Sequence, residues 1–98
     1  MNALITYDIS ARHTEVKAAM LANGRGYFDS WSSNNQTYYL PNTSLWKPNT
    51  TPQTAKAEIQ QVIQALNLNQ PANNQIRLER CVAVEWSKWD GIPGDARR

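Results

Sequence analysis

The stretch TPQTAKAEIQQVIQALNLNQPANNQIRLERCVAVEW, residues 51–86, contains the two clearest hydrophobic patterns of the chain. Thr51 followed by Pro52 is typical of a helix start, because threonine can cap a helix and proline is favoured at its first position. Apolar residues then recur three and four apart, which predicts a helix over residues 52–66. After a polar linker the apolar residues alternate, and this period of two predicts a strand over residues 76–86.

The residues before this stretch contain a second set of elements. Residues 2–9 alternate in part and are rich in β-formers, which predicts a first strand. Ser10 is a good helix N-cap, and the apolar spacing after it predicts a helix over residues 12–23. Two aromatic and β-rich segments, residues 27–31 and 37–40, flank a polar break and predict a hairpin with a longer, looser loop than a two-residue turn.

The order of predicted elements is strand, helix, strand, strand, helix, strand, which is typical of the α+β ferredoxin-like βαββαβ fold. We therefore expect a four-stranded antiparallel sheet with two helices on one face. Residues 42–51 carry turn residues and Pro48 around two apolar side chains, and are expected to form a long anchored loop. Residues 1–98 then make one domain, with residues 87–98 as an irregular C-terminal tail.

The composition predicts a folded, soluble chain without a strong charge. Hydrophobic residues make up 41% of it, well above what keeps a chain disordered. Ten Lys+Arg against eight Asp+Glu give a net charge of +2, which leaves nucleic acid possible as a partner without arguing for it. The lone Cys81, the lack of signal-peptide features in residues 1–9 and the lack of a long apolar run predict a cytoplasmic protein without membrane contact.

The segment LITYDIS, residues 4–10, resembles the hydrophobic strand and Tyr-Asp-Ile start of a family of small CRISPR-associated endonucleases and adaptation subunits, and of the related virulence-associated protein D toxins. Over residues 11–86 the similarity is one of element order and spacing. The resemblance implies a homodimer that binds RNA or DNA, with Asp8 as a metal ligand paired with its twin across the dimer axis. Two facing carboxylates can hold Mg²⁺ or Mn²⁺ and activate a water. The resemblance thus implies a metal-dependent endoribonuclease in which Asp8 is the catalytic residue.

The chain departs from that family after the aspartate. Family members usually continue with a basic helix, whereas this chain offers Arg12, His13 and Lys17, and Glu15 offsets one of them. Where the family commonly has a Ser-Val-Phe strand, this chain has Asp-Ser-Trp at residues 29–31. We expect the three basic residues to be the nucleic-acid contacts of this helix.

Three candidate residues also have structural interpretations. Asp8 ends a strand before a helix, where it can act as a cap instead of binding a metal. His13 can act as a general acid or base, although a lone histidine on a first helical turn is more often solvated. Cys81 has no histidine near it in the sequence, which favours a buried or interface thiol over a catalytic one.

Aromatic residues concentrate in the predicted hairpin, the long loop and the last strand. They can stack bases, as on RNA-recognition sheets of this topology, or form the core or a dimer interface. The Gly and Phe patterns of RNA-recognition strands are absent from the sequence, which favours packing or an interface. Arg80 shares the phase of the apolar residues in the last strand, which indicates an interface or a buried partner. The expected dimer interface contains Trp31, Tyr39, Arg80 and Trp86.

Two functions therefore stay open. The first is a nucleic-acid-binding homodimer that cleaves RNA with a divalent metal at Asp8. The second is a non-catalytic dimer, an adaptor that uses its aromatic sheet face for protein contacts. The weak basicity favours the adaptor, and the setting of Asp8 favours the enzyme.

Overall fold

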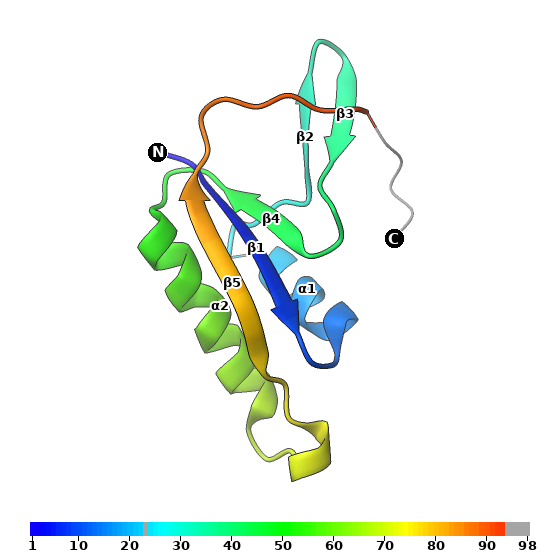
Figure 1. Ribbon diagram of the computed structural model, residues 1–98, viewed down its shortest axis with the longest axis vertical. Helices are drawn as coiled ribbons and strands as arrows, with labels where there is room; N and C mark the ends of the chain where they lie inside the picture. The colour runs from blue at the N-terminus through cyan, green and yellow to red at the C-terminus, as the bar shows by residue number, and fades with distance from the viewer. Residues whose placement is uncertain (23, 94–98) are drawn as a thin grey trace.

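The computed structural model describes residues 1–22 and 24–93 and has the mixed α+β class expected from the sequence (Figure 1). Its elements, in chain order, are β1 (Ala3–Ile9), α1 (His13–Leu21), β2 (Ser30–Ser33), β3 (Gln36–Tyr39), β4 (Ser44–Lys47), α2 (Pro52–Asn67), the 3₁₀ turn η1 (Ala72–Asn74) and β5 (Leu78–Glu85).

The strands form two antiparallel sheets instead of the predicted four-stranded sheet. One sheet has the order β4-β1-β5, and the other is the β2–β3 hairpin. The prediction was wrong because residues 44–47, expected in a loop, form a strand that pairs with β1 from Ala3↔Lys47 to Thr6↔Ser44. Residues 27–29 contribute only the isolated bridge Phe28↔Trp46 to the outer side of β4.

The β2–β3 hairpin is confirmed, with a tighter turn than the sequence suggested. Ser33 pairs with Gln36, so the connection consists of Asn34 and Asn35 alone. Both asparagines have positive φ, 51° and 64°, which is the backbone of a type I′ turn. Asparagine tolerates this left-handed region better than most residues, and the two-residue turn therefore forms without glycine.

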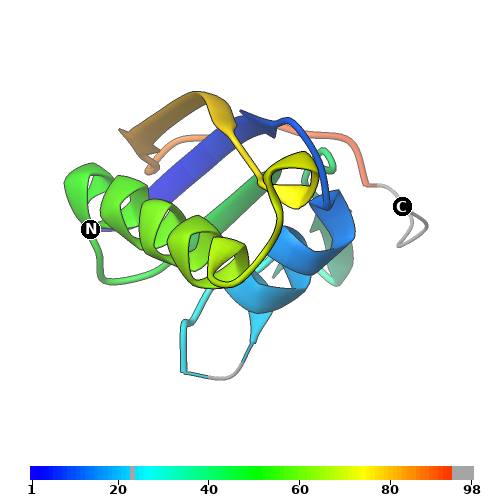
Figure 2. The same ribbon diagram turned by 90° about the horizontal axis from the view of Figure 1, so that it is seen from below.

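Both helices pack on one face of the three-stranded sheet, as expected (Figure 2). The core contains side chains from β1, from both helices and from β4. Burying an aliphatic side chain stabilises a fold by roughly 1.5–3 kcal/mol, so this layer holds the molecule together. The fully buried members of largest volume are Ile5, Val16, Met20, Leu45, Ile59 and Val62.

The two helices begin differently. The cap of α2 is the predicted one, because the backbone N–H of Thr54 donates to the Thr51 hydroxyl at 3.1 Å. Ser10 does not cap α1: its hydroxyl accepts from the Arg77 backbone N–H at 2.8 Å and ties the end of β1 to the segment before β5. The residue that precedes α1 is Arg12, whose φ of 57° turns the chain into the helix.

Alternation along β5 determines which of its side chains face the helices. Cys81 and Ala83 pack against the core, whereas Val82 and Val84 point away from the helices and are 58% and 45% exposed. We call the helix-free side of the β4-β1-β5 sheet the open face.

The predicted tail has no helix or strand in its described part, residues 87–93, and residues 94–98 lie outside the described residues. Neither helix in the described parts of the chain is long and apolar enough to cross a membrane.

Candidate functional site

Asp8 lies near the carboxyl end of β1, directly opposite Arg80 of β5. The Arg80 Nε donates to the Asp8 Oδ2 at 2.7 Å, and the two side chains are 80% and 48% exposed. The pair stands on the open face, in phase with Val82. An ion pair this exposed contributes only about 0–1 kcal/mol, so a stronger ligand for the carboxylate can open it.

A single copy of the chain offers little to a metal ion at this place. Within residues 1–22 and 24–93, no group of three or more His, Cys, Asp or Glu side chains lies close enough to share a metal. One carboxylate supplies at most two of the six oxygens that Mg²⁺ requires. A metal at Asp8 therefore needs ligands from a second copy, from water or from a bound phosphate.

The three basic residues predicted to contact nucleic acid have different surroundings. The Arg12 guanidinium is bonded to Glu15 and to two backbone carbonyl oxygens, Leu66 O at 3.1 Å and Asn74 O at 3.3 Å. Its hydrogen bond holds the pKa of the Glu15 carboxyl below the usual value. Arg12 thus joins α1 to the end of α2, and most of its donors are used inside the chain.

Lys17 and His13 lie together on one side of α1, where His13 is exposed and Lys17 is half-buried. They line a small cavity of about 240 Å³ that Asn42 closes. The Lys17 ammonium lies 3.3 Å from Asn42 Oδ1 and 3.7 Å from the Asp29 carboxylate. The structure brings these two predicted contacts together, whereas Arg12 is bonded to the end of α2 and to η1.

The four predicted interface residues divide between two regions. Arg80 belongs to the pair with Asp8. Trp31 and Trp86 contact each other with ring centroids 4.8 Å apart at 82°, near the other end of the sheet. Tyr39 is opposite Ser30 in the hairpin.

Trp31 and Trp86 belong to a larger aromatic cluster that the sequence analysis did not foresee. The chain after β5 crosses to the β2–β3 hairpin (Figure 1), and Trp89 packs on Trp31 with ring centroids 4.8 Å apart. Trp46 of β4 packs on Trp86 at 5.1 Å. The signal in the sequence was the presence of two tryptophans in the last strand and tail, beside two in the hairpin and loop.

All four tryptophans line one cavity of about 260 Å³, together with three small polar residues. We call it the tryptophan pocket. Its lining consists of Asn2, Trp31, Ser32, Trp46, Trp86, Ser87 and Trp89.

Two indole N–H groups of the pocket residues differ in whether they have a hydrogen-bond acceptor. Trp46 Nε1 donates to the Ser30 carbonyl oxygen at 2.8 Å. Trp31 Nε1 is buried and has no acceptor among the described residues. A buried donor without a partner costs about 1–3 kcal/mol, which offsets part of the stability that packing of the Trp31 ring provides.

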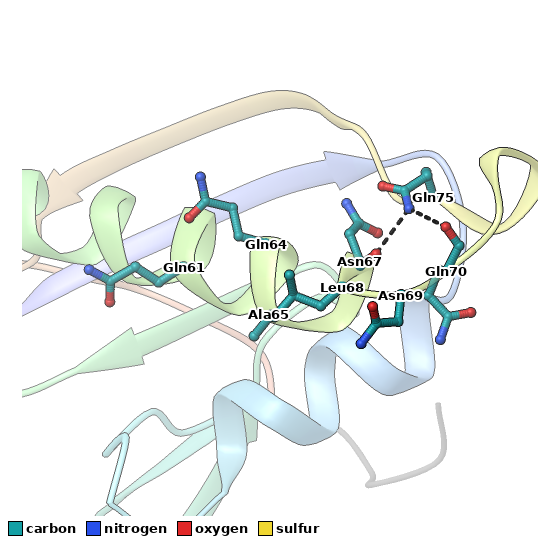
Figure 3. A pocket seen from close by; sticks show the side chains of 8 residues that line it. All are labelled: Gln61, Gln64, Ala65, Asn67, Leu68, Asn69, Gln70 and Gln75. Carbon is teal, nitrogen blue, oxygen red and sulfur yellow. Dashed lines mark hydrogen bonds between the residues drawn. The ribbon is translucent and has the colours of Figure 1, made fainter.

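A larger depression of about 790 Å³ lies at the end of α2 (Figure 3). Amide side chains dominate its lining, and several of them are used in closing the turn to η1. Gln75 Nε2 donates to the carbonyl oxygens of Asn67 and Gln70 at 3.0 and 2.9 Å. Asn67 also exchanges hydrogen bonds with the backbone of Ile76. The amide groups that line this depression thus stabilise the α2–β5 connection, and its described lining has no charged group.

The other titratable groups in the interior, Cys81 and the Tyr27–Glu58–Lys47 cluster, take part in packing and in contacts between elements. Burial raises the pKa of the Cys81 thiol, which keeps it protonated at neutral pH and unsuited to nucleophilic attack. The Tyr27 hydroxyl donates to Glu58 at 2.8 Å, and Lys47 bonds both oxygens of that carboxylate at 3.1 Å. This cluster joins β4 to α2.

Comparisons with protein families, with curated proteins and with solved structures find no match to this chain. The similarity to the CRISPR-associated and virulence-associated protein D group therefore stays a prediction from residues 4–10.

Proposed function

We propose that the chain forms a homodimer through its open face, binds nucleic acid, and cleaves RNA with Mg²⁺ or Mn²⁺ held at Asp8, in the manner of the small CRISPR-associated and virulence-associated protein D nucleases. The observation that supports this best is the place of Asp8. Its carboxylate is exposed at one end of an apolar face that a second copy can cover.

The open face and its edge support dimerisation. Val82 and Val84 expose apolar surface in the middle of β5. Among the described residues, no strand pairs with the outer edge of β5, and an uncovered edge of eight residues is a ready template for another chain. A second copy can cover the open face through a self-complementary contact about a two-fold axis.

The strand order supports a ferredoxin-like origin for the fold. In the order β4-β1-β5, the last strand β5 lies beside β1. On the other side of β1 lies β4, which corresponds to the third strand of the ferredoxin-like fold. The Phe28↔Trp46 bridge stands where that fold has its second strand. We therefore regard the chain as a variant in which that strand is reduced to one bridge and the hairpin β2–β3 has been added.

The chemistry at Asp8 follows from the weakness of its ion pair. When an axis passes beside Asp8, two carboxylates face each other, and each can exchange Arg80 for a shared divalent cation. Such a cation lowers the pKa of a bound water and polarises a phosphodiester. Each released Arg80 guanidinium is then free to bind a phosphate with two parallel hydrogen bonds.

The free thiol of the chain, Cys81, suits a reducing compartment, and we therefore propose that this activity takes place in the cytoplasm.

The test is cleavage of end-labelled single-stranded RNA with Mn²⁺ or Mg²⁺, with the molar mass of the protein measured by light scattering. We expect a dimer, and cleavage that is lost in Asp8→Asn. Glu79→Gln is the matched control, because it also removes an exposed carboxylate on β5 and should cleave normally. Cleavage that persists unchanged in Asp8→Asn would disprove the assignment.

The non-catalytic adaptor is the second candidate, and the surroundings of the basic residues favour it. Arg12 is held by contacts within the chain, and Lys17 is already near Asn42 and Asp29. A dimer that shows no cleavage and no salt-dependent binding to RNA would support this second function.

A further inference from the structure

We propose that the tryptophan pocket binds one unstacked base of a single-stranded nucleic acid. This inference rests on the proposed function in taking nucleic acid as the ligand, and it adds a binding site distant from Asp8.

The size of the pocket suits one base. Pockets for drug-sized ligands have volumes of roughly 300–1,000 Å³, and this one has about 260 Å³. The bases of a duplex are covered on both faces by their neighbours, so only a base that has left its stack can enter.

The walls of the pocket suit a flat ring. The Trp31 ring stands at 82° to the rings of both Trp86 and Trp89, with centroids 4.8 Å away in each case. These rings contact one another directly, and Trp31 also stacks on Tyr38 with ring centroids 5.5 Å apart, so a planar ligand meets the parts of the indoles that face the pocket. Stacking on an aromatic side chain is the usual way in which proteins hold single-stranded bases, because every base has a π face.

The polar groups of the pocket suit the edge of a base. Ring nitrogens and carbonyl oxygens of bases accept hydrogen bonds, and their amino groups donate them. The Asn2 amide can both donate and accept, and the hydroxyls of Ser32 and Ser87 can do the same. A purely hydrocarbon ligand would leave these groups unsatisfied.

The charges around the pocket favour this ligand over a cation. In the part of the chain that the structure describes, no Asp or Glu lines the pocket, so a quaternary ammonium group would find aromatic faces but no countercharge. Lys88 is exposed between the lining residues Ser87 and Trp89, where it can meet the phosphate beside a bound base.

The pocket and Asp8 lie at opposite ends of β1, which gives them separate roles. Asn2 precedes β1 and Asp8 lies near its end, and six residues of strand span about 20 Å. A base held in the pocket is therefore an anchor for the strand and is not the nucleotide cleaved at Asp8.

The test uses the Asp8→Asn protein in EDTA, so that cleavage cannot interfere, and a fluorescein-labelled ten-nucleotide single-stranded RNA observed by anisotropy. We expect binding that weakens roughly 5- to 150-fold in Trp31→Ala, the range for loss of one base stack. Trp31→Phe keeps an aromatic ring at this place and should weaken binding less than Trp31→Ala does. Leu68→Ala is the control, an exposed apolar side chain at the end of α2 outside the lining, and should bind normally.

Mononucleotides give the readout that separates this site from Asp8. We expect them to quench tryptophan emission equally in the wild type and in Asp8→Asn. Quenching by mononucleotides without any RNA cleavage would support the base-binding pocket and contradict the proposed nuclease activity. RNA binding that is unchanged in both Trp31 variants would overturn the pocket and leave the nuclease standing. Quenching by a proline-rich peptide or an oligosaccharide, with none by nucleotides, would also overturn it.

Discussion

The two ends of β1 are built in opposite ways. At its carboxyl end Asp8 and Arg80 form an exposed ion pair that is cheap to open. At its amino end four tryptophans from three separate segments line an open cavity. The first end can change partners without disturbing the fold, but needs groups from outside the chain to hold a metal. The second end already has its binding groups in place and cannot be rearranged without loss of packing.

The largest effect should come from removing a tryptophan at the aromatic end. Trp86→Ala deletes contacts with both Trp31 and Trp46. Since core Trp→Ala changes cost about 3–5 kcal/mol and Trp86 is only partly buried, we expect a loss of roughly 2–4 kcal/mol in the free energy of unfolding. Urea denaturation measures it. A loss below 1 kcal/mol would show that the cluster does not support the fold.

Alkaline pH should test the buried middle of β1, between the two ends. Burial raises the pKa of Tyr7 from 10.0 to about 12 and also raises that of Tyr27. The native state keeps these protons longer than the unfolded state, so stability is full below pH 10 and is lost as the pH rises through 12. We expect Tyr7 to contribute roughly 3 kcal/mol of that loss.

The measurement is urea denaturation at steps of pH from 8 to 12, with Tyr7→Phe as the control. The variant keeps the buried ring and has no hydroxyl to ionise, so its stability should fall less steeply above pH 10. Identical slopes in both proteins would contradict the assignment.

A smaller effect should separate the two indole N–H groups of the aromatic end. Trp46→Phe loses a hydrogen bond to Ser30 and leaves that carbonyl oxygen without it, whereas Trp31→Phe removes a donor that had no acceptor. We expect Trp31→Phe to be less destabilising by about 1–2 kcal/mol. Thermal unfolding of the two variants side by side tests this, and equal losses would mean that Trp31 is bonded in solution.

The smallest effect should come from the charged end. Asp8→Asn leaves the size of the side chain unchanged and removes an exposed pair, so we expect at most about 1 kcal/mol of destabilisation, and less in high salt. Urea denaturation at low and high ionic strength measures it. A loss of more than 2 kcal/mol would give Asp8 a structural role and weaken the comparison between the two ends.

Much of the fold could be predicted from local patterns. The strand at residues 2–9, both helices, the hairpin and the last strand are all present, with shifts at their ends. Strand β4 was missed because it has four residues between a turn and Pro48, and forms by pairing with β1, which local propensity does not register.

The sites depended still more on tertiary contacts. The phase of Arg80 in β5 was visible in the sequence, but its partner Asp8 is fixed by the register between β1 and β5. The tryptophan pocket could not be predicted, because Trp89 lies in a segment rich in glycine and proline that has no period. Only the path of the chain across the hairpin brings that ring to Trp31.

The central position of β1 has a consequence for synthesis. Its partner β5 is synthesised well after it, because the paired residues Asp8 and Arg80 are 72 positions apart. Contacts so distant along the chain slow folding, because a long loop must close before they are gained. Until β5 is made, β1 lacks one of its two neighbouring strands, and its apolar row of Ile5, Tyr7 and Ile9 is incompletely covered.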